Sequence, residues 1–220
     1  MSIVYDANNL PLGSSDLVNA LHQAGYGVAG QVFTSNGDGV KPTFQTGVGT
    51  GSITLIASVT ASASATVNFD NNLSSTYDNY LVLVENILPA STPVTLNFVI
   101  GTGGTPTYQV TNYVTFYTKF TSATQITGVG TAAEVLLCTP LKYTTTANLV
   151  GSTMLQLYNI NAAVYKNFTS TSFLNDVTSG YTTTITGAVW QTTTVLTSIR
   201  FAMSTGNIST GTFKLYGYKN

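Results

Sequence analysis

Charge is scarce in this sequence. Only 7% of the residues are Asp, Glu, Lys or Arg, whereas a globular protein usually carries about 25%. Binding to nucleic-acid phosphates needs clustered Lys and Arg, but the seven basic residues are scattered between Lys41 and Lys219. We therefore expect no nucleic-acid partner. Weak charge repulsion favours association in solution, so the composition suits a protein that is locked into an assembly.

Reactive residue types are also scarce. The single cysteine, Cys138, excludes an intrachain disulfide, and its apolar neighbours predict a small buried side chain rather than a nucleophile. The single histidine, His22, cannot form a multi-histidine metal site, and we expect a structural or capping role for it. The glycines of 101–104 lack the following Lys and helix of a phosphate-binding loop, so this segment predicts a hairpin turn.

The few acids do not form an evident catalytic pair. Glycoside hydrolysis needs two carboxylates about 5–10 Å apart. Asp70 and Asp78 flank a turn and can lie close together, but acids in such turns usually form Asx-turns. A calcium site of Asp70, Asn71, Asn72 and Asp78 is chemically reasonable because oxygen ligands cluster there. It remains the minor alternative, and we expect no enzymatic activity, no metal and no cofactor.

Long apolar runs are absent as well. No run approaches the roughly 20 residues that a membrane-spanning helix needs, so membrane insertion is not expected. Residues 2–9 show neither the basic nor the apolar region of a secretory signal. The sequence thus gives no indication of secretion or of a membrane span.

The sequence is rich in Thr, Ser, Asn and Gly, and from Ser52 onward its apolar residues alternate with polar ones. The alternation is clearest in 94–100, 198–203 and 213–216, and it is typical of half-buried antiparallel strands. Roughly eight to eleven short strands without intervening helices predict an all-β sandwich or barrel. The further strand candidates are 52–60, 64–69, 79–87, 107–117, 133–138, 153–160, 163–170 and 181–191.

Aromatic residues add detail to two of these strands. A continuous strand over 107–117 carries large side chains on both faces: Tyr108, Val110, Val114 and Phe116 on one, and Tyr113 and Tyr117 on the other. Such a strand is often covered on both sides, which is a weak indication of oligomerisation. We expect Trp190 to lie in the core, with stacking on a sugar as the alternative for this and other aromatic residues.

The first 51 residues differ from the rest. Ser14–Gly25 is the only good helix candidate, with a Ser N-cap, a C-terminal Gly and an apolar face of Leu17, Val18, Leu21 and Ala24. The following glycine-rich stretch contains Asn36-Gly37, a strong turn signal. Val32, Phe33 and Thr34 can pair across it with 43–45 as a short hairpin. The large side chains here, including Phe44, need a neighbouring subunit or the main domain.

Three segments resemble parts of tailed-bacteriophage virion proteins. Gly30–Gln45, with Gly-Gln-Val-Phe-Thr-Ser-Asn-Gly and then Pro-Thr-Phe-Gln, resembles a segment that recurs in tail fibres and related appendages. Phe69–Tyr80 resembles the opening of C-terminal β-domains in phage minor structural proteins. Gly211–Asn220 is similar to the Gly-x-Phe-x-Leu-Tyr-Gly ending of the same proteins. The resemblance implies a virion appendage, and such proteins are commonly homotrimers.

Together these observations predict two parts and one role. Residues 1–51 form an anchor and trimeric neck, in which the anchoring side chains are Leu17, Val18, Leu21, Val32, Phe33 and Phe44. Residues 52–220 form a jelly-roll-like antiparallel β-sandwich. The expected role is a short tail fibre or fibre tip that attaches the virion to a host glycan or protein. The alternative is a capsid-bound head fibre, decoration or cement protein without a ligand. The expected partners are further copies of this chain and other virion proteins.

Overall fold

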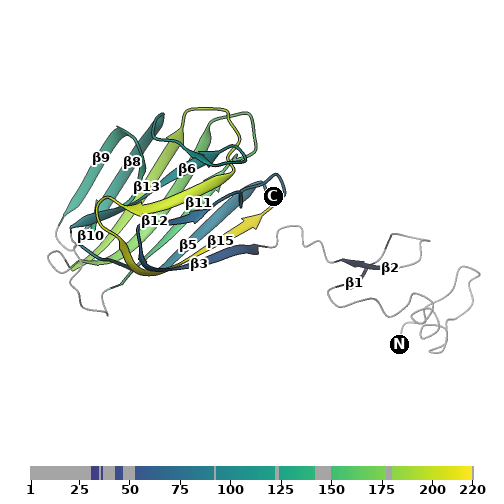
Figure 1. Ribbon diagram of the computed structural model, residues 1–220, viewed down its shortest axis with the longest axis horizontal. Helices are drawn as coiled ribbons and strands as arrows, with labels where there is room; N and C mark the ends of the chain where they lie inside the picture. Colours follow the sequence, from purple (N-terminus) through teal and green to yellow (C-terminus); the bar gives the residue numbers. More distant parts are fainter. Residues whose placement is uncertain are drawn as a thin grey trace, which may run out of the picture. The chain divides into compact units, whose positions relative to one another are not determined.

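The computed structural model describes residues 31–34, 36, 43–46, 53–91, 93–121, 124–141, 150–176 and 180–219. Contacts along the chain divide it into two units, Met1–Ser52 and Ile53–Asn220. Every regular element in the described residues is a β-strand (Figure 1). The predicted helix with Leu17, Val18 and Leu21 lies outside the described residues. Among the residues that are described, no helix is long and apolar enough to cross a membrane.

The described part of the first unit is a β-hairpin. β1 (Gln31–Thr34) pairs antiparallel with β2 (Thr43–Thr46), and Phe33 stands opposite Phe44. The Asn36 amide donates to Thr43 Oγ1 at 3.1 Å, and its Oδ1 accepts from Gln45 Nε2 at 2.8 Å. The hairpin predicted across Asn36-Gly37 is therefore confirmed.

The second unit is made of antiparallel strands in two layers (Figure 1). Its described residues form thirteen strands, more than the eight to eleven expected: β3 (Thr54–Ser64), β4 (Thr66–Phe69), β5 (Asn79–Pro89), β6 (Val94–Thr102), β7 (Thr107–Tyr108), β8 (Tyr113–Phe120), β9 (Gln125–Ala132), β10 (Val135–Leu141), β11 (Gly151–Tyr158), β12 (Lys166–Asp176), β13 (Gly180–Trp190), β14 (Ser198–Met203) and β15 (Ile208–Tyr218). The all-β prediction is confirmed, and the two separate layers favour a sandwich over a closed barrel.

Two of the strand predictions need correction. The strand predicted over 107–117 is interrupted, because Asn112 adopts a left-handed conformation (φ 67°). The interruption leaves β7 in one sheet and β8 in the other, so Tyr108 and Phe116 do not share a strand face. β9 was not predicted, because Gly128 and Gly130 interrupt the alternation of its side chains.

The strand order follows from four long-range pairings. β3 pairs with β15, β4 with β14, β5 with β11, and β6 with β10, all antiparallel. These eight strands, called the hairpin strands below, thus fold like one long β-hairpin whose arms cross repeatedly between two layers. The larger sheet has the order β3-β15-β5-β11-β12-β13-β8-β9, and the smaller has β10-β6-β14-β4 with β7 beside β6. The strands β12, β13, β8 and β9, called the extension strands, lengthen the larger sheet beyond β11.

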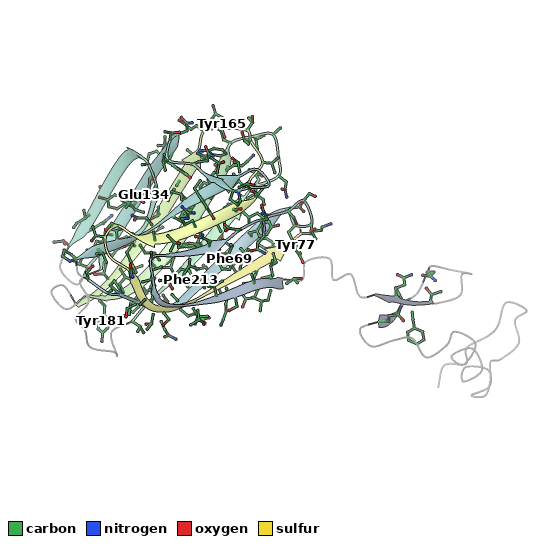
Figure 2. All side chains as sticks on the ribbon, in the orientation of Figure 1. Phe69, Tyr77, Glu134, Tyr165, Tyr181 and Phe213 are labelled. Carbon is green, nitrogen blue, oxygen red and sulfur yellow. The ribbon has the colours of Figure 1, made fainter. Side chains whose placement is uncertain are left out.

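Aromatic side chains fill the space between the two layers of hairpin strands. Phe201 of β14 lies 5.2 Å from Phe213 of β15, measured between ring centroids, and 6.4 Å from Phe69. Phe98 of β6 meets Phe168 of β12 edge to face at 5.3 Å. Figure 2 labels Phe69 and Phe213 within the domain. Fully burying each such side chain contributes about 1.5–3 kcal/mol, so this cluster is the main support of the fold.

Trp190 belongs to the same interior. Its side chain is buried, and its indole N–H donates to the Thr111 carbonyl oxygen at 3.1 Å. The prediction of a core position for Trp190 is confirmed.

Candidate functional site

Buried Lys166 holds loops together at one end of the domain. Its side chain is fully buried at the start of β12. The ammonium group donates to the carbonyl oxygens of Ala162, Val164 (2.8 Å) and Thr193 (3.4 Å). Burial lowers the pKa of Lys166. The three carbonyl bonds join the loop before β12 to the segment after β13, which is a structural role.

Asp70 also binds within the protein. Its Oδ1 accepts a hydrogen bond from the Tyr108 hydroxyl, and the Arg200 guanidinium lies 3.6 Å from the centre of the Tyr108 ring. Burial, and then the Asp70 carboxylate, raise the pKa of Tyr108. The neighbouring Asn71 amide donates to the Gly104 carbonyl oxygen at 2.9 Å. Asp70 and Asn71, two of the four residues of the calcium site considered above, therefore bind within the protein and hold loops together.

Two further predictions concern this end of the domain. The segment 101–104 leads from β6 into β7, which pair with each other, so the predicted hairpin turn is confirmed. Across the residues that the structure describes, no group of three or more His, Cys, Asp or Glu side chains is placed to hold a metal ion.

The outer face of the larger sheet is different in character. Along the extension strands and β11, the outward positions carry no Asp, Glu, Lys, Arg or His. Large apolar and aromatic side chains stand exposed there, and we call this set the neutral face: Phe116, Phe120, Val129, Met154, Phe173, Tyr181 and Ile185. Val129 is 72% exposed and Tyr181 68%. Figure 1 shows β8, β9 and β13 side by side, and Figure 2 labels Tyr181 at the margin of the domain.

The pairing registers bring these residues together. Phe116 of β8 stands opposite Val129 of β9 on one side and Gly187 of β13 on the other. The rings of Phe173 and Tyr181 stack at 5.9 Å between centroids. Residues that are far apart in the sequence therefore come onto one uncharged face of five neighbouring strands, where exposed apolar side chains alternate with threonines and other neutral residues.

A hollow of about 360 Å³ lies beside Phe116, and its lining residues come from β8, β9 and β13: Phe116, Tyr117, Thr118, Thr127, Gly128, Val129, Ile185 and Gly187. A Cβ atom at Gly187 would have no heavy atom within 4 Å, so the missing side chain leaves space there. A Cβ atom at Gly128 would instead collide with the ring of Tyr117. The hollow can receive an apolar group, and its threonine hydroxyls supply neutral hydrogen-bonding groups.

The inner side of the extension strands is unusually polar. The inward side chains of β13 include Thr182, Thr184 and Thr186, while Tyr181 and Ile185 point outward. In the described residues, the buried hydroxyls of these three threonines, and of Thr115 and Ser170, have no hydrogen-bond partner. A strand whose outer face meets water normally shows the opposite pattern, apolar inside and polar outside.

The predicted anchoring residues fall into two groups. Leu17, Val18 and Leu21 lie outside the described residues, while Val32 and Phe33 lie on β1 and Phe44 on β2. The strand pairing places Phe33 opposite Phe44 and Val32 opposite Gln45, and the Phe44 side chain is half-buried.

The neutral face is a set that sequence analysis did not identify. The alternation separated Phe116 from Tyr113 correctly, but it could not tell which side was covered. The available signal was the placing of threonine at three alternate positions of β13, Thr182, Thr184 and Thr186, opposite to Tyr181 and Ile185.

Comparisons with known proteins leave the chain without an identified relative. No protein family, no curated protein and no solved structure matches it.

Proposed function

We propose that this chain is a non-enzymatic structural protein of a tailed-bacteriophage virion, and that it serves as a short tail fibre or fibre tip in host attachment. The observation that carries the proposal is the neutral face. Exposed apolar patches above a few hundred Å² mark interaction surfaces on soluble proteins. Because only 7% of its residues are charged, the chain has little charge repulsion to keep its copies apart in solution. These features fit a protein that works inside an assembly.

The strand pairing supports a jelly-roll interpretation of the second unit. Numbered in chain order, the hairpin strands pair first with last, second with seventh, third with sixth, and fourth with fifth. That is the connectivity of a rolled-up hairpin, with the extension strands added as insertions. Jelly rolls occur in viral capsid and lectin domains, but a fold alone does not decide a function. Its weight here comes from its agreement with the phage resemblance.

Two of the three segments that carry the resemblance are adjacent in space. Residues 69–80 lead from β4 into β5, and residues 211–218 belong to β15, which pairs with β5. Tyr80 stands opposite Gly217, and a Cβ atom at Gly217 would collide with the ring of Tyr77. The Tyr80 hydroxyl bonds both the N–H and the carbonyl oxygen of Ser74. The ring of Tyr77 in one segment thus requires the glycine at position 217 in the other. This supports the interpretation that the two segments form one structural unit.

The proposed mechanism is multivalent attachment. Several copies of a weak binding surface, held in a homotrimer and fixed to the virion by other virion proteins, give an avidity that one copy lacks. A host glycan or protein with little charge is the proposed ligand, and loops at one end of the β-domain that offer Tyr, Asn and Thr side chains are its proposed contact, which leaves the neutral face for contacts within the assembly. The protein is proposed to reside in the virion after assembly in the host cytoplasm.

A capsid-bound head fibre, decoration or cement protein is the second candidate. The division of the chain favours it, because the unit Met1–Ser52 leads directly into a single β-domain without a long repetitive shaft between them. In this case the neutral face would serve assembly alone, without a ligand.

Electron cryomicroscopy of an intact particle tests the proposal. Copies of this chain at the tail tip would support attachment, and copies on the capsid lattice would support the second candidate. Absence of the chain from purified particles, checked by mass spectrometry of the same sample, would contradict both.

A further inference from the structure

We propose that the neutral face is the contact surface between copies of this chain, so that its partner is a second copy of the same β-domain. This inference rests on the proposed assembly role and adds to it the surface and the partner. Its three supports are the inverted polarity of the extension strands, the area of the face and its lack of charge.

The inverted polarity is the first support. On β13 the inward positions hold Thr182, Thr184 and Thr186, and the outward positions hold Tyr181 and Ile185. Burying unpaired hydroxyls costs free energy, and exposing apolar side chains to water forgoes the free energy of burial. Covering the outer face of β13 would recover this free energy of burial, so β13 is suited to an apolar neighbour on its outer side.

The exposed area is the second support. A large side chain offers about 150–250 Å², so seven that are roughly half exposed leave on the order of 700 Å² open. This exceeds the largest apolar patch of a typical monomer, about 300–600 Å². It is close to the roughly 800 Å² that each partner contributes to a stable protein complex. The face is therefore large enough for one specific interface.

The absence of charge is the third support and indicates which partner fits. A partner with ionised groups at the contact would have to bury them without an opposite charge on this face, which is strongly unfavourable. In the proposed homotrimer, the matching surface is the neutral face of a neighbouring copy, because its outward positions are equally free of charge. The face also offers both complementary shapes, since Val129 and Tyr181 project from it and the hollow beside Phe116 can receive a side chain.

The free edge of the sheet adjoins the same surface. β9 ends the larger sheet, and Gln125–Ala132 contains no proline and no charged residue. Natural edge strands are usually protected by charges, prolines or bulges against pairing with another chain. The ladder between β8 and β9 runs without a register shift. A second copy seated on the neutral face would also lie over this unprotected edge.

Photo-cross-linking of the purified full-length chain tests the proposal. In one variant, Phe116 is replaced by the photoreactive residue p-benzoylphenylalanine. In the matched control, Leu55 is replaced by the same residue. Both native side chains are 52% exposed on the outer side of the larger sheet, but β3 and β8 are separated by five intervening strands. The expected result is a covalent dimer from position 116, with the partner peptide mapped by mass spectrometry to β8, β9, β12 or β13. The variant with the photoreactive residue at position 55 should give at least tenfold less covalent dimer.

A second set of variants shows whether the contact depends on this surface. Adding Val129→Glu and Ile185→Glu to the position-116 protein should lower the dimer yield at least tenfold, because two carboxylates would be buried at the contact. Adding Leu55→Glu should leave the yield unchanged. Circular dichroism checks that each variant is folded.

Three results would overturn the inference: no dimer from position 116, an equal yield from position 55, or a yield that survives the double substitution. The test uses no phage particle, so it can fail while the proposed location in the virion stands, and the reverse is equally possible.

Discussion

Within the larger sheet, the hairpin strands β3, β15, β5 and β11 and the extension strands β12, β13, β8 and β9 form one continuous sheet but place polar side chains differently. Over the hairpin strands, aromatic residues such as Phe213 face inward, and the outer side carries the ion pair of Lys214 and Glu85, 2.7 Å between Nζ and Oε2. On β13 of the extension strands, by contrast, Thr182, Thr184 and Thr186 face inward, and Tyr181 and Ile185 face outward. The outer side of the hairpin strands is suited to water, and the proposed contact between copies would account for the apolar outer side of β13.

The largest expected difference between the two regions is in the response to losing a phenylalanine. Phe213→Ala should lower the free energy of unfolding by about 3–5 kcal/mol, because it leaves a cavity between the layers. Phe173→Ala, on the neutral face, removes a partly exposed ring and its stacking on Tyr181, so its effect should stay below about 1.5 kcal/mol. Urea denaturation of both variants, at a protein concentration low enough to separate the copies, measures the difference. Equal losses would show that Phe173 is buried within a single copy, in a second core.

Glycine substitutions give the next comparison. Gly217→Ala on β15 forces a methyl group into the ring of Tyr77, and such overpacking should destabilise the fold by about 1–3 kcal/mol. Gly187→Ala on β13 meets open space and should be neutral or stabilising by up to about 1 kcal/mol, because alanine restricts the unfolded chain. Denaturant midpoints of the two variants provide the measurement. A destabilising Gly187→Ala would indicate that the hollow is already filled.

Two interior hydroxyls of the extension strands should behave differently. Ser172 Oγ lies 2.7 Å from the Leu137 carbonyl oxygen and 2.8 Å from Thr153 Oγ1, so Ser172→Ala should lose about 1–2 kcal/mol of stability. Thr184, its cross-strand neighbour, has a buried hydroxyl without a partner. Thr184→Val keeps the shape of the side chain and should be neutral or stabilising. Thermal melts of both variants measure this, and a large loss for Thr184→Val would mean that a buried water or another group binds its hydroxyl.

The smallest effect is expected on the outer side of the hairpin strands. Hydrogen bonding to Glu85 raises the pKa of Lys214, yet exposed ion pairs add little to stability and are screened by salt. Lys214→Ala should therefore leave the denaturant midpoint almost unchanged at high salt. A clear loss that persists at high salt would show that this outer surface also carries an essential contact.

The sequence predicted the local features of the fold better than its long-range features. Alternation identified the strands around Phe98, Phe201 and Phe213, and Asn36-Gly37 identified the hairpin of the first unit, because both signals are local. The interruption at Asn112 was missed, because a left-handed asparagine within a β-rich run leaves no mark on the alternation. β9 was missed because its glycines hide the period.

Identifying the neutral face requires information that a single sequence does not contain. Alternation shows that Tyr181 and Ile185 share one side of β13 and Thr184 the other, but only the strand pairing shows which side is covered. The usual rule that apolar side chains face the interior would have assigned Tyr181 and Ile185 to the inner side of β13, which is the wrong side. This rule fails on β13 of the extension strands, and that failure is the reason to look for a partner there.

The most direct test of the central claim is an electron cryomicroscopy structure of the purified, assembled full-length protein. The prediction is that each copy buries its neutral face against another copy, so that Val129, Tyr181 and Ile185 lose the exposure they have in a single chain. Copies that are joined elsewhere, with this face open to solvent, would contradict it.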